Sequence, residues 1–385
     1  MGVLRVEPAR AQEWAARSIG AIWRAYDLQL TIYALLLTGF GLAMAYSNTV
    51  EAGSAVLSPG STFVRGLMWA ALAIVVFTAA TAFDYTWFRT FAWPIYVVNL
   101  GLLVLSLAIG DGVGGSARWV SIGPFQVQFS EIAKILMIIV LANYLARRQG
   151  RLDRPWPILG ACLLVGPPII LVVLQPDLGT SLVFGAILMG MLFLSGASLR
   201  WLGALTAVIL AAIPIAWTYV LRDYQKQRLI SFLDPSADPQ GSGFQLLQAQ
   251  SAVSSGGPFG KGLTNGVADG SFLPVQTTDF VFAKLGEELG FIGALVVFAL
   301  FCALIWRVLV TGWRSRDPFG LLVAAGVGSM ILFQFVVNVG MVIGVMPITG
   351  IPLPFVTHGG ASLISLAFGL GILQSVNIRQ LRAEW

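Results

Sequence analysis

The chain has 385 residues, of which 57% are hydrophobic and only 11% are charged, with a formal net charge of +5 and a mean hydropathy of +0.82. Such a composition excludes an ordinary soluble domain and predicts a protein with many membrane-spanning segments. The positive charge does not indicate nucleic-acid binding, because the basic residues lie between the apolar segments. Cys162 and Cys302 both fall within apolar segments, so we expect no disulfide.

Residues 1–27 combine arginines with interspersed tryptophan, isoleucine and tyrosine residues, and they contain no apolar run of the kind found in a signal peptide. This pattern predicts a short amphipathic helix that lies on the cytoplasmic lipid headgroups. A disordered basic tail is the alternative.

About ten apolar runs follow, each long enough to cross roughly 30 Å of hydrocarbon as a helix. The expected spans are residues 28–47, 63–83, 91–110, 130–147, 157–175, 179–196, 201–221, 281–310, 318–343 and 355–377. The sequence therefore predicts an all-α polytopic membrane protein, in which residues 1–385 form a single membrane domain.

The basic residues predict how these spans are oriented. With the N-terminus in the cytoplasm, the short loops assigned to the inside carry about two thirds of the 23 lysines and arginines, as the positive-inside rule requires. Half of the others belong to residues 222–280, a long loop to which the rule gives little weight. We therefore expect both termini in the cytoplasm and this large loop, between the seventh and eighth spans, outside the cytoplasmic membrane.

The large loop ends in LPVQTTDFVFAKLGEELGF, which leads directly into the eighth span. Asp279 is therefore expected near the outer membrane surface at a helix N-terminus, where it is the candidate catalytic carboxylate. Thr278 or Asp279 would equally suit the N-cap of that helix, and the sequence alone does not separate the two roles. Lys284 is expected to pair locally with Glu287 or Glu288 on the same helix.

Two glycine-rich stretches do not fit nucleotide-binding motifs. GDGVGG after the third span lacks a surrounding βαβ unit, and GGPFGKG at 256–262 is too short for a P-loop, with Gly262 where serine or threonine is required. The first stretch leads instead to Arg118 and Trp119, which could hold a phosphate and stack on a sugar ring. Interface anchoring of this pair is the alternative that the pattern itself favours.

Glu131 and Lys134 lie three residues apart on one face of the fourth span. Ionisable side chains inside a span are costly and usually face a partner or a cavity. Asp177, at the outer turn between the fifth and sixth spans, is a candidate third member of this cluster. We expect the cluster to support a cavity structurally.

The last outer loop, MPITGIPLPFVTHGGASL at 346–363, carries several prolines and a glycine pair between two spans. Irregular backbone at membrane depth is tolerated only where it lines protein or a water-filled cavity, so this loop is expected to fold back and wall a cleft. His358, the one histidine of the chain, is expected to line that cleft rather than act as a base.

Several stretches within residues 118–363 together resemble the SEDS family (shape, elongation, division and sporulation), in the family's own order. They are RWVSIGPFQVQFSEIAK, QPDLGTSLVF, YQKQRLISFLDPSADPQGSGFQLLQAQSAVSSGG, TTDFVFAKLGEELGFIGA and NVGMVIGVMPITGIPLPFVTHGGASL. MPITGIPLPF has the form typical of the RodA branch rather than the FtsW branch. The resemblance implies a peptidoglycan glycosyltransferase of the inner membrane that polymerises lipid II. It also implies a class B penicillin-binding protein as the partner that crosslinks the strands.

The resemblance also assigns residues. The family's essential aspartate in its TDF motif falls on Asp279, and its functionally important loop tryptophan falls on Trp119. The acid and base of SEIAK fall on Glu131 and Lys134, and the aspartate of QPD falls on Asp177. Three positions depart from residues common in the family without removing a proposed catalytic group: Phe129, Thr277 and His358.

The chemistry of lipid II fits a single catalytic carboxylate. Glycosidases typically need two, one of them to protonate a poor leaving group. Lipid II leaves as a polyprenyl pyrophosphate, which cations can stabilise, so one general base suffices. We expect Asp279 to be that base, with inversion from an α-linked donor to a β-1,4 bond.

Other groups would hold the substrate. The cations expected at the pyrophosphate are Arg118, Lys261 and Arg228, and a divalent cation such as Mg²⁺ or Mn²⁺ could share that task. Thr278 and His358 are expected to help position the substrate, and the apolar spans to supply grooves for the polyprenyl tails.

Other functions fit parts of the pattern. A lipid II flippase or secondary transporter would also use a helix bundle with internal charges and broken helices. A transporter should carry its decisive charges at the membrane midplane, whereas here they concentrate at the outer surface. A division-type paralogue resembling FtsW and an inactive scaffold that recruits the transpeptidase are further alternatives.

Overall fold

The computed structural model describes residues 25–58, 60–110, 119–122, 125–238, 241–266, 279–357 and 359–380. The helix expected on the cytoplasmic headgroups lies almost wholly outside these described residues.

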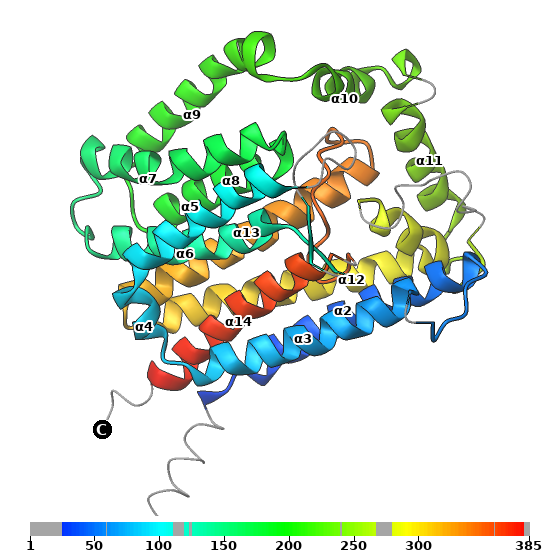
Figure 1. The fold of residues 1–385 in the computed structure, drawn as a ribbon, viewed down its shortest axis with the longest axis horizontal. Coiled ribbons are helices and arrows are strands. Elements are labelled where there is room, and N and C mark those ends of the chain that lie inside the picture. The colour runs from blue at the N-terminus through cyan, green and yellow to red at the C-terminus, as the bar shows by residue number, and fades with distance from the viewer. Residues whose placement is uncertain are drawn as a thin grey trace, which may run out of the picture.

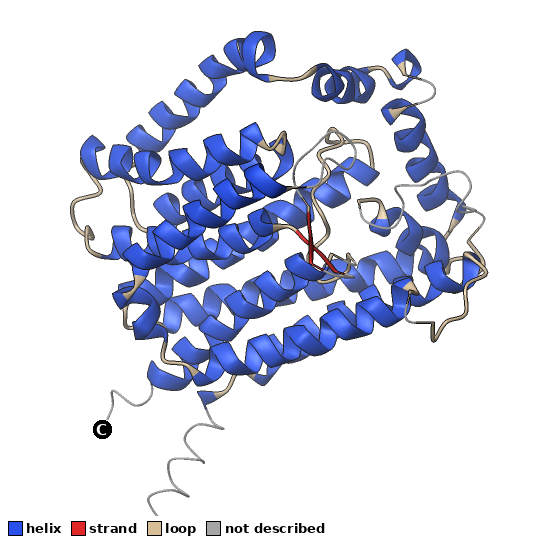
Figure 2. Ribbon diagram, viewed as in Figure 1, coloured by secondary structure: helices blue, strands red, loops and turns tan. Residues whose placement is uncertain are grey.

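The described chain is helical apart from one short hairpin (Figure 2). The long helices are α2 (Leu28–Glu51), α3 (Thr62–Ala82), α5 (Ala92–Ile109), α6 (Phe129–Ala146), α7 (Pro155–Leu174), α8 (Leu178–Leu194), α9 (Leu199–Ile215), α12 (Val281–Arg314), α13 (Pro318–Val342) and α14 (Gly360–Gln380). The shorter elements are α4 (Tyr85–Thr90), a π-helical turn at Ala216–Val220, α10 (Asp223–Leu233), a 3₁₀ turn at Pro235–Ala237, and α11 (Ser242–Ser255). Strand β1 (Val120–Ile122) pairs antiparallel with β2 (Phe125–Val127).

The predicted number of spans is confirmed. Nine of the described helices have at least 18 residues and are apolar enough to cross a membrane, α9 being counted together with its π-helical turn. Helix α8 is also apolar and, at 17 residues, supplies the tenth span. The expected start of the last span at residue 355 was wrong, because α14 begins at Gly360. Prolines at 352 and 354 lack the N–H that a helix needs, and Phe355 adopts a positive φ of 63°.

Helices α6, α13 and α14 form the centre of the bundle (Figure 1). In each of them 72% of the most apolar window is buried, whereas the corresponding share for α9 with its π-helical turn is 6%. Glycines allow the central helices to approach their neighbours closely, as is common in membranes. A Cβ on Gly326 of α13 would overlap the side chain of Ile138 of α6, and a Cβ on Gly371 of α14 would meet the backbone of Phe77 of α3.

The two ends of the bundle differ. Helix α4 and the last turns of α14 lie at one end, whereas α10 and α11 lie toward the other (Figure 1). Helix α12 packs against α11 and is broken at Gly290, whose φ of 67° and ψ of −167° are not helical. The functional side chains predicted from the sequence gather at this second end.

Candidate active site

One cleft brings together five of the predicted site residues, which come from distant parts of the chain. It has a volume of about 200 Å³ and is lined by Trp119, Glu131, Asp177, Arg228 and Asp279, with Gln128, Thr180, Gly350, Pro352, Thr357, Gly359, Ala361 and Ser362. The hairpin, the first turns of α6, α8 and α14, helix α10, the start of α12 and the loop before α14 all contribute. The loop at 346–363 therefore walls a cleft, as its prolines predicted.

Asp279 lies just before α12 and is held there through its backbone. The side-chain amide of Asn338 on α13 donates to the carbonyl oxygen of Asp279 at 2.9 Å and to that of Ile351 at 2.8 Å. The N-cap position of α12 is occupied by Phe280 rather than by Asp279. Asp279, one residue earlier, lines the cleft.

Arg228 and Asp279 approach the same glycine. A Cβ on Gly350 would lie 3.4 Å from Oδ2 of Asp279 and 3.7 Å from Nη1 of Arg228. Arg228 is carried by α10, which Tyr224 fixes by donating a hydrogen bond from its hydroxyl to the carbonyl of Pro176 at 2.9 Å. The cleft therefore places a carboxylate and a guanidinium group within reach of one ligand.

Glu131 and Lys134 form an ion pair within α6. Their charged atoms are 2.6 Å apart, and both side chains are almost fully buried. Oε1 of Glu131 accepts from Lys134, whereas its Oε2 is buried without a hydrogen-bond partner among the described residues. Glu131 also lines the cleft, so Lys134 supports a residue of the cleft wall from behind.

Asp177 is the N-cap of α8. Its carboxylate accepts from the backbone N–H of Thr180 at 3.0 Å and from the Thr180 hydroxyl at 3.0 Å, and Gln128 donates to Oδ2 at 2.9 Å. An aspartate three residues before a threonine at a helix start is a capping signal that the sequence carried. Gln128 also lines the cleft, but no sequence pattern predicted this, because a single polar residue in a loop does not indicate a site.

Lys261 and Lys284 lie outside the cleft lining. The amino group of Lys261 is 2.6 Å from Oε1 of Glu287. The expected local pairing of Lys284 is confirmed with Glu288 at 3.4 Å, and Lys284 also reaches Glu51 at the end of α2 at 2.5 Å. The three remaining predicted site residues fall outside the described chain: Arg118, Thr278 and His358.

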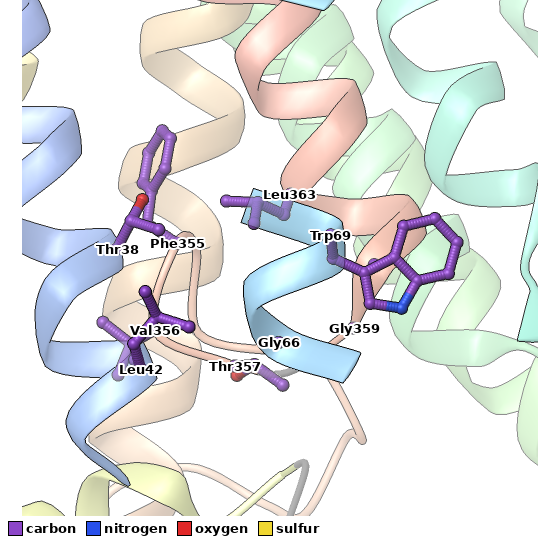
Figure 3. A pocket seen from close by; sticks show the side chains of 11 residues that line it. Thr38, Leu42, Gly66, Trp69, Phe355, Val356, Thr357, Gly359 and Leu363 are labelled. Atoms are coloured by element: carbon purple, nitrogen blue, oxygen red, sulfur yellow. The ribbon is translucent and has the colours of Figure 1, made fainter. Parts of the chain in front are cut away.

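An apolar groove leads to the cleft. It has a volume of about 200 Å³ and lies between α2 and α3 against α14, with Ala34, Leu35, Ala70, Ala73, Phe77 and Leu370 among its lining residues. A small pocket of about 20 Å³, here called the constriction, lies between the groove and the cleft (Figure 3). The constriction shares Thr38, Phe355 and Leu363 with the groove, and it shares Thr357 and Gly359 with the cleft. The three spaces therefore adjoin one another.

Trp69 of α3 forms one side of this constriction (Figure 3). Its indole ring lies directly against the backbone of Gly360, so that a Cβ at that position would overlap the ring. An elongated amphiphile would fit this arrangement, with its apolar tail in the groove and its polar head in the cleft. No group of three histidine, cysteine, aspartate or glutamate side chains suited to a metal ion occurs within the described residues.

The fold and this site define a polytopic α-helical membrane protein with a polar cleft at one end and an apolar groove leading into it. Comparisons with known proteins agree. The family model described as "Cell cycle protein", which covers FtsW, RodA and SpoVE, matches residues 28–381. The peptidoglycan glycosyltransferase MrdB of Escherichia coli K12 is 41% identical over 74% of this chain and 76% of its own length.

Two further matches cover nearly the whole chain. The probable peptidoglycan glycosyltransferase FtsW of Geobacter metallireducens is 34% identical over 92% of this chain and 95% of its own length. A protein chain from the structure entitled "Structural coordination of polymerization and crosslinking by a peptidoglycan synthase complex" is 30% identical, with a TM-score of 0.77 over 92% of this chain and 98% of that one. The chain belongs to the FtsW, RodA and SpoVE family, the SEDS family, and is a peptidoglycan glycosyltransferase.

Proposed function

We propose that this chain polymerises lipid II into β-1,4-linked glycan strands for wall elongation, with Asp279 as the general base. The observation that carries the proposal is the cleft itself, where Asp279 and Arg228 face one glycine at the end of an apolar groove. The sequence MPITGIPLPF favours elongation over division.

The reaction follows from these groups. The Asp279 carboxylate accepts the proton of the acceptor 4-hydroxyl, whose oxygen forms a bond to the anomeric carbon of the donor. The bond from that carbon to the pyrophosphate oxygen breaks, and the electron pair leaves with the polyprenyl pyrophosphate. Arg228 offers a bidentate donor to the departing negative charge. Attack opposite the leaving group inverts an α-linked donor to a β-linked product.

The surroundings of the cleft support a lipid-linked substrate. The groove between α2 and α3 is apolar enough to take a polyprenyl tail, and Trp119 offers an aromatic face to a sugar. In the proposed orientation the chain spans the cytoplasmic membrane with the cleft on its outer side. A class B penicillin-binding protein is the proposed partner, because a matching chain belongs to a peptidoglycan synthase complex.

Polymerisation of purified lipid II by the protein together with its class B penicillin-binding protein tests the function. The Asp279→Asn variant keeps the size of the side chain and loses its basicity, so the rate should fall by roughly 10²- to 10⁴-fold. The matched control is Asp223→Asn on α10, which removes a fully exposed carboxylate and should retain the wild-type rate.

Three outcomes would contradict the proposal in different ways. Equal polymer from wild type and Asp279→Asn would remove the general base from Asp279. Equal loss in the Asp223→Asn control would show that the assay responds to charge in general. Lipid II that crosses vesicle membranes with the wild-type protein, but is never polymerised, would favour transport.

A further inference from the structure

The segment 256–262, the GGPFGKG stretch, is inserted into helix α12 at its break. In an uninterrupted helix the carbonyls of Glu287 and Glu288 would accept from the N–H groups of Phe291 and Ile292. Here the N–H groups of Lys261 and Gly262 donate to those two carbonyls, both at 3.0 Å. The orphaned N–H groups of Phe291 and Ile292 donate in turn to the carbonyls of Gly257 and Pro258, at 2.9 and 3.1 Å.

Each lost helical hydrogen bond is thus replaced by two bonds to the inserted segment. This satisfies the backbone of α12 at a depth where unpaired polar groups are costly. Helix α12 therefore consists of an outer half-helix, 281–289, and an inner half-helix, 291–314, with residues 256–262 of the large outer loop between them.

Glycines make this insertion sterically possible. A Cβ on Gly256 would overlap the carbonyl oxygen of Gly286, and one on Gly260 would overlap that of Glu288. A Cβ on Gly290 would overlap the backbone nitrogen of Gly260. Gly260 and Gly290 also adopt positive φ values of 79° and 67°, which disfavour any other residue. Gly257 has a positive φ of 57°, but a Cβ there would meet nothing within 4 Å.

Side-chain contacts also stabilise the junction between the inserted segment and the outer half-helix. Lys261 extends from the inserted segment to Glu287, whose side chain is almost fully buried. One turn earlier on the outer half-helix, Lys284 binds Glu51 at 2.5 Å and Asn48 at 2.5 Å, both on α2. Glu288 accepts a hydrogen bond from the Ser47 hydroxyl. The outer half-helix is therefore held on one side by α2 and at its inner end by the loop.

We propose that Lys261 and the inserted segment are positioning elements that set the orientation of the outer half-helix and, through it, the position of the Asp279 carboxylate. The half-helix of residues 281–289 is about 13 Å long, so a tilt of roughly 5° about its inner end moves its first residue by about 1 Å. A displacement of that size at a catalytic group can lower the rate by about 10²-fold. The catalytic part of this inference rests on the proposed role of Asp279.

Hydrogen–deuterium exchange of the full-length protein tests the insertion without reference to activity. Peptides that contain Lys261, Gly262, Phe291 and Ile292 should exchange slowly in the wild type. Gly260→Ala should accelerate exchange in both segments, because its Cβ would displace the segment from Glu288. Gly257→Ala is the matched control, because Gly257 also has a positive φ but a Cβ there would meet no other atom. This variant should leave the amides of both segments protected from exchange. Unchanged exchange in Gly260→Ala would overturn the insertion.

Kinetics in the complex with the transpeptidase partner test the positioning role of Lys261. Lys261→Met should lower kcat for lipid II polymerisation by about 10- to 100-fold with little change in KM, because the cleft lining is intact. The charge exchange Lys261→Glu with Glu287→Lys should restore much of kcat, whereas Lys261→Glu alone should not.

The outcomes separate the possible roles of Lys261. A raised KM without rescue by the charge exchange would mean that Lys261 binds the pyrophosphate directly, and this would overturn the positioning role. A lowered melting temperature with an unchanged kcat would also overturn it, leaving only a contribution to stability. A wild-type protein that fails to polymerise lipid II would refute the proposed function and the catalytic part of this inference, while the exchange measurement still decides the insertion.

Discussion

Glu131 and Lys134 carry opposite charges inside the bundle, where each depends on the other. Transfer of a single charge out of water costs several kcal/mol, and only the close contact at 2.6 Å offsets that cost. The pair therefore contributes little net stability, but the loss of one member leaves the other charged, buried and unpaired. This asymmetry is what a mutational experiment should detect.

The Lys134→Met variant should lower the free energy of unfolding by about 3–5 kcal/mol, because it leaves Glu131 buried without its partner. The double variant Glu131→Gln with Lys134→Met should be less affected than Lys134→Met alone. Thermal unfolding in detergent measures both. Lys226→Met, which removes a weak surface pair with an exposed partner at 4.0 Å, is the control and should unfold as the wild type does. A loss of stability in the double variant that is as large as, or larger than, the loss in Lys134→Met alone would contradict the interpretation.

Contacts along one helix could be predicted from the sequence, whereas contacts across the bundle could not. The Glu131–Lys134 pair follows from a spacing of three residues. The pair of Lys284 with Glu288 follows from the same kind of spacing, whereas the shorter contact of Lys284 with Glu51 of α2 comes from a position that no local spacing reveals. Asn338, whose amide holds the backbone of Asp279, begins one of the family-like stretches, but no spacing rule indicated its contact with Asp279.

At the level of helices, the apolar runs predicted most boundaries within a few residues, since the width of the hydrocarbon layer sets their length. The break in α12 was not predicted. Gly290 stands at the start of a continuous apolar run, two residues after Glu288, and glycine at such a position does not by itself break a helix. The break depends on the GGPFGKG segment, which must arrive from the outer loop to replace the lost hydrogen bonds.

The groove between α2 and α3 makes a prediction about substrate length. Ala73→Phe should fill part of the groove and exclude two or three methylene groups of a polyprenyl tail, which is about 2 kcal/mol or roughly 30-fold in KM. A lipid II analogue with a tail too short to pass the constriction should show little change.

Ala71→Phe is the matched control for the groove. Ala71 lies on the same helix but is exposed at the bundle surface and does not line the groove. Kinetics of polymerisation with long-tailed and short-tailed lipid II compare the two variants. A similar change in KM for both variants, or for both substrates, would show that the tail does not occupy this groove.

At the scale of the whole molecule, the sequence predicted the number of spans but not which of them lie at the centre. In a soluble protein an apolar face marks the core, but lipid is as apolar as a protein interior, so hydropathy does not distinguish the two in a membrane. Helix α9 and helix α13 both have high hydropathy, yet α13 is central and α9 is almost fully exposed. The position of the cleft follows from this arrangement and could not be derived from the sequence alone.

The orientation of the bundle remains a prediction, and it rests on the basic residues of the short loops. Single cysteines introduced into a background in which Cys162 and Cys302 are replaced by serine can test it. The Ser254→Cys variant carries its thiol on the exposed surface of α11, and the Gln149→Cys variant carries it in the arginine-rich loop after α6. A membrane-impermeant maleimide should label Ser254→Cys in intact cells, but Gln149→Cys only after the membrane is permeabilised. The reverse pattern would place Asp279 and its cleft in the cytoplasm, on the side opposite the wall, and would exclude polymerisation of externally displayed lipid II.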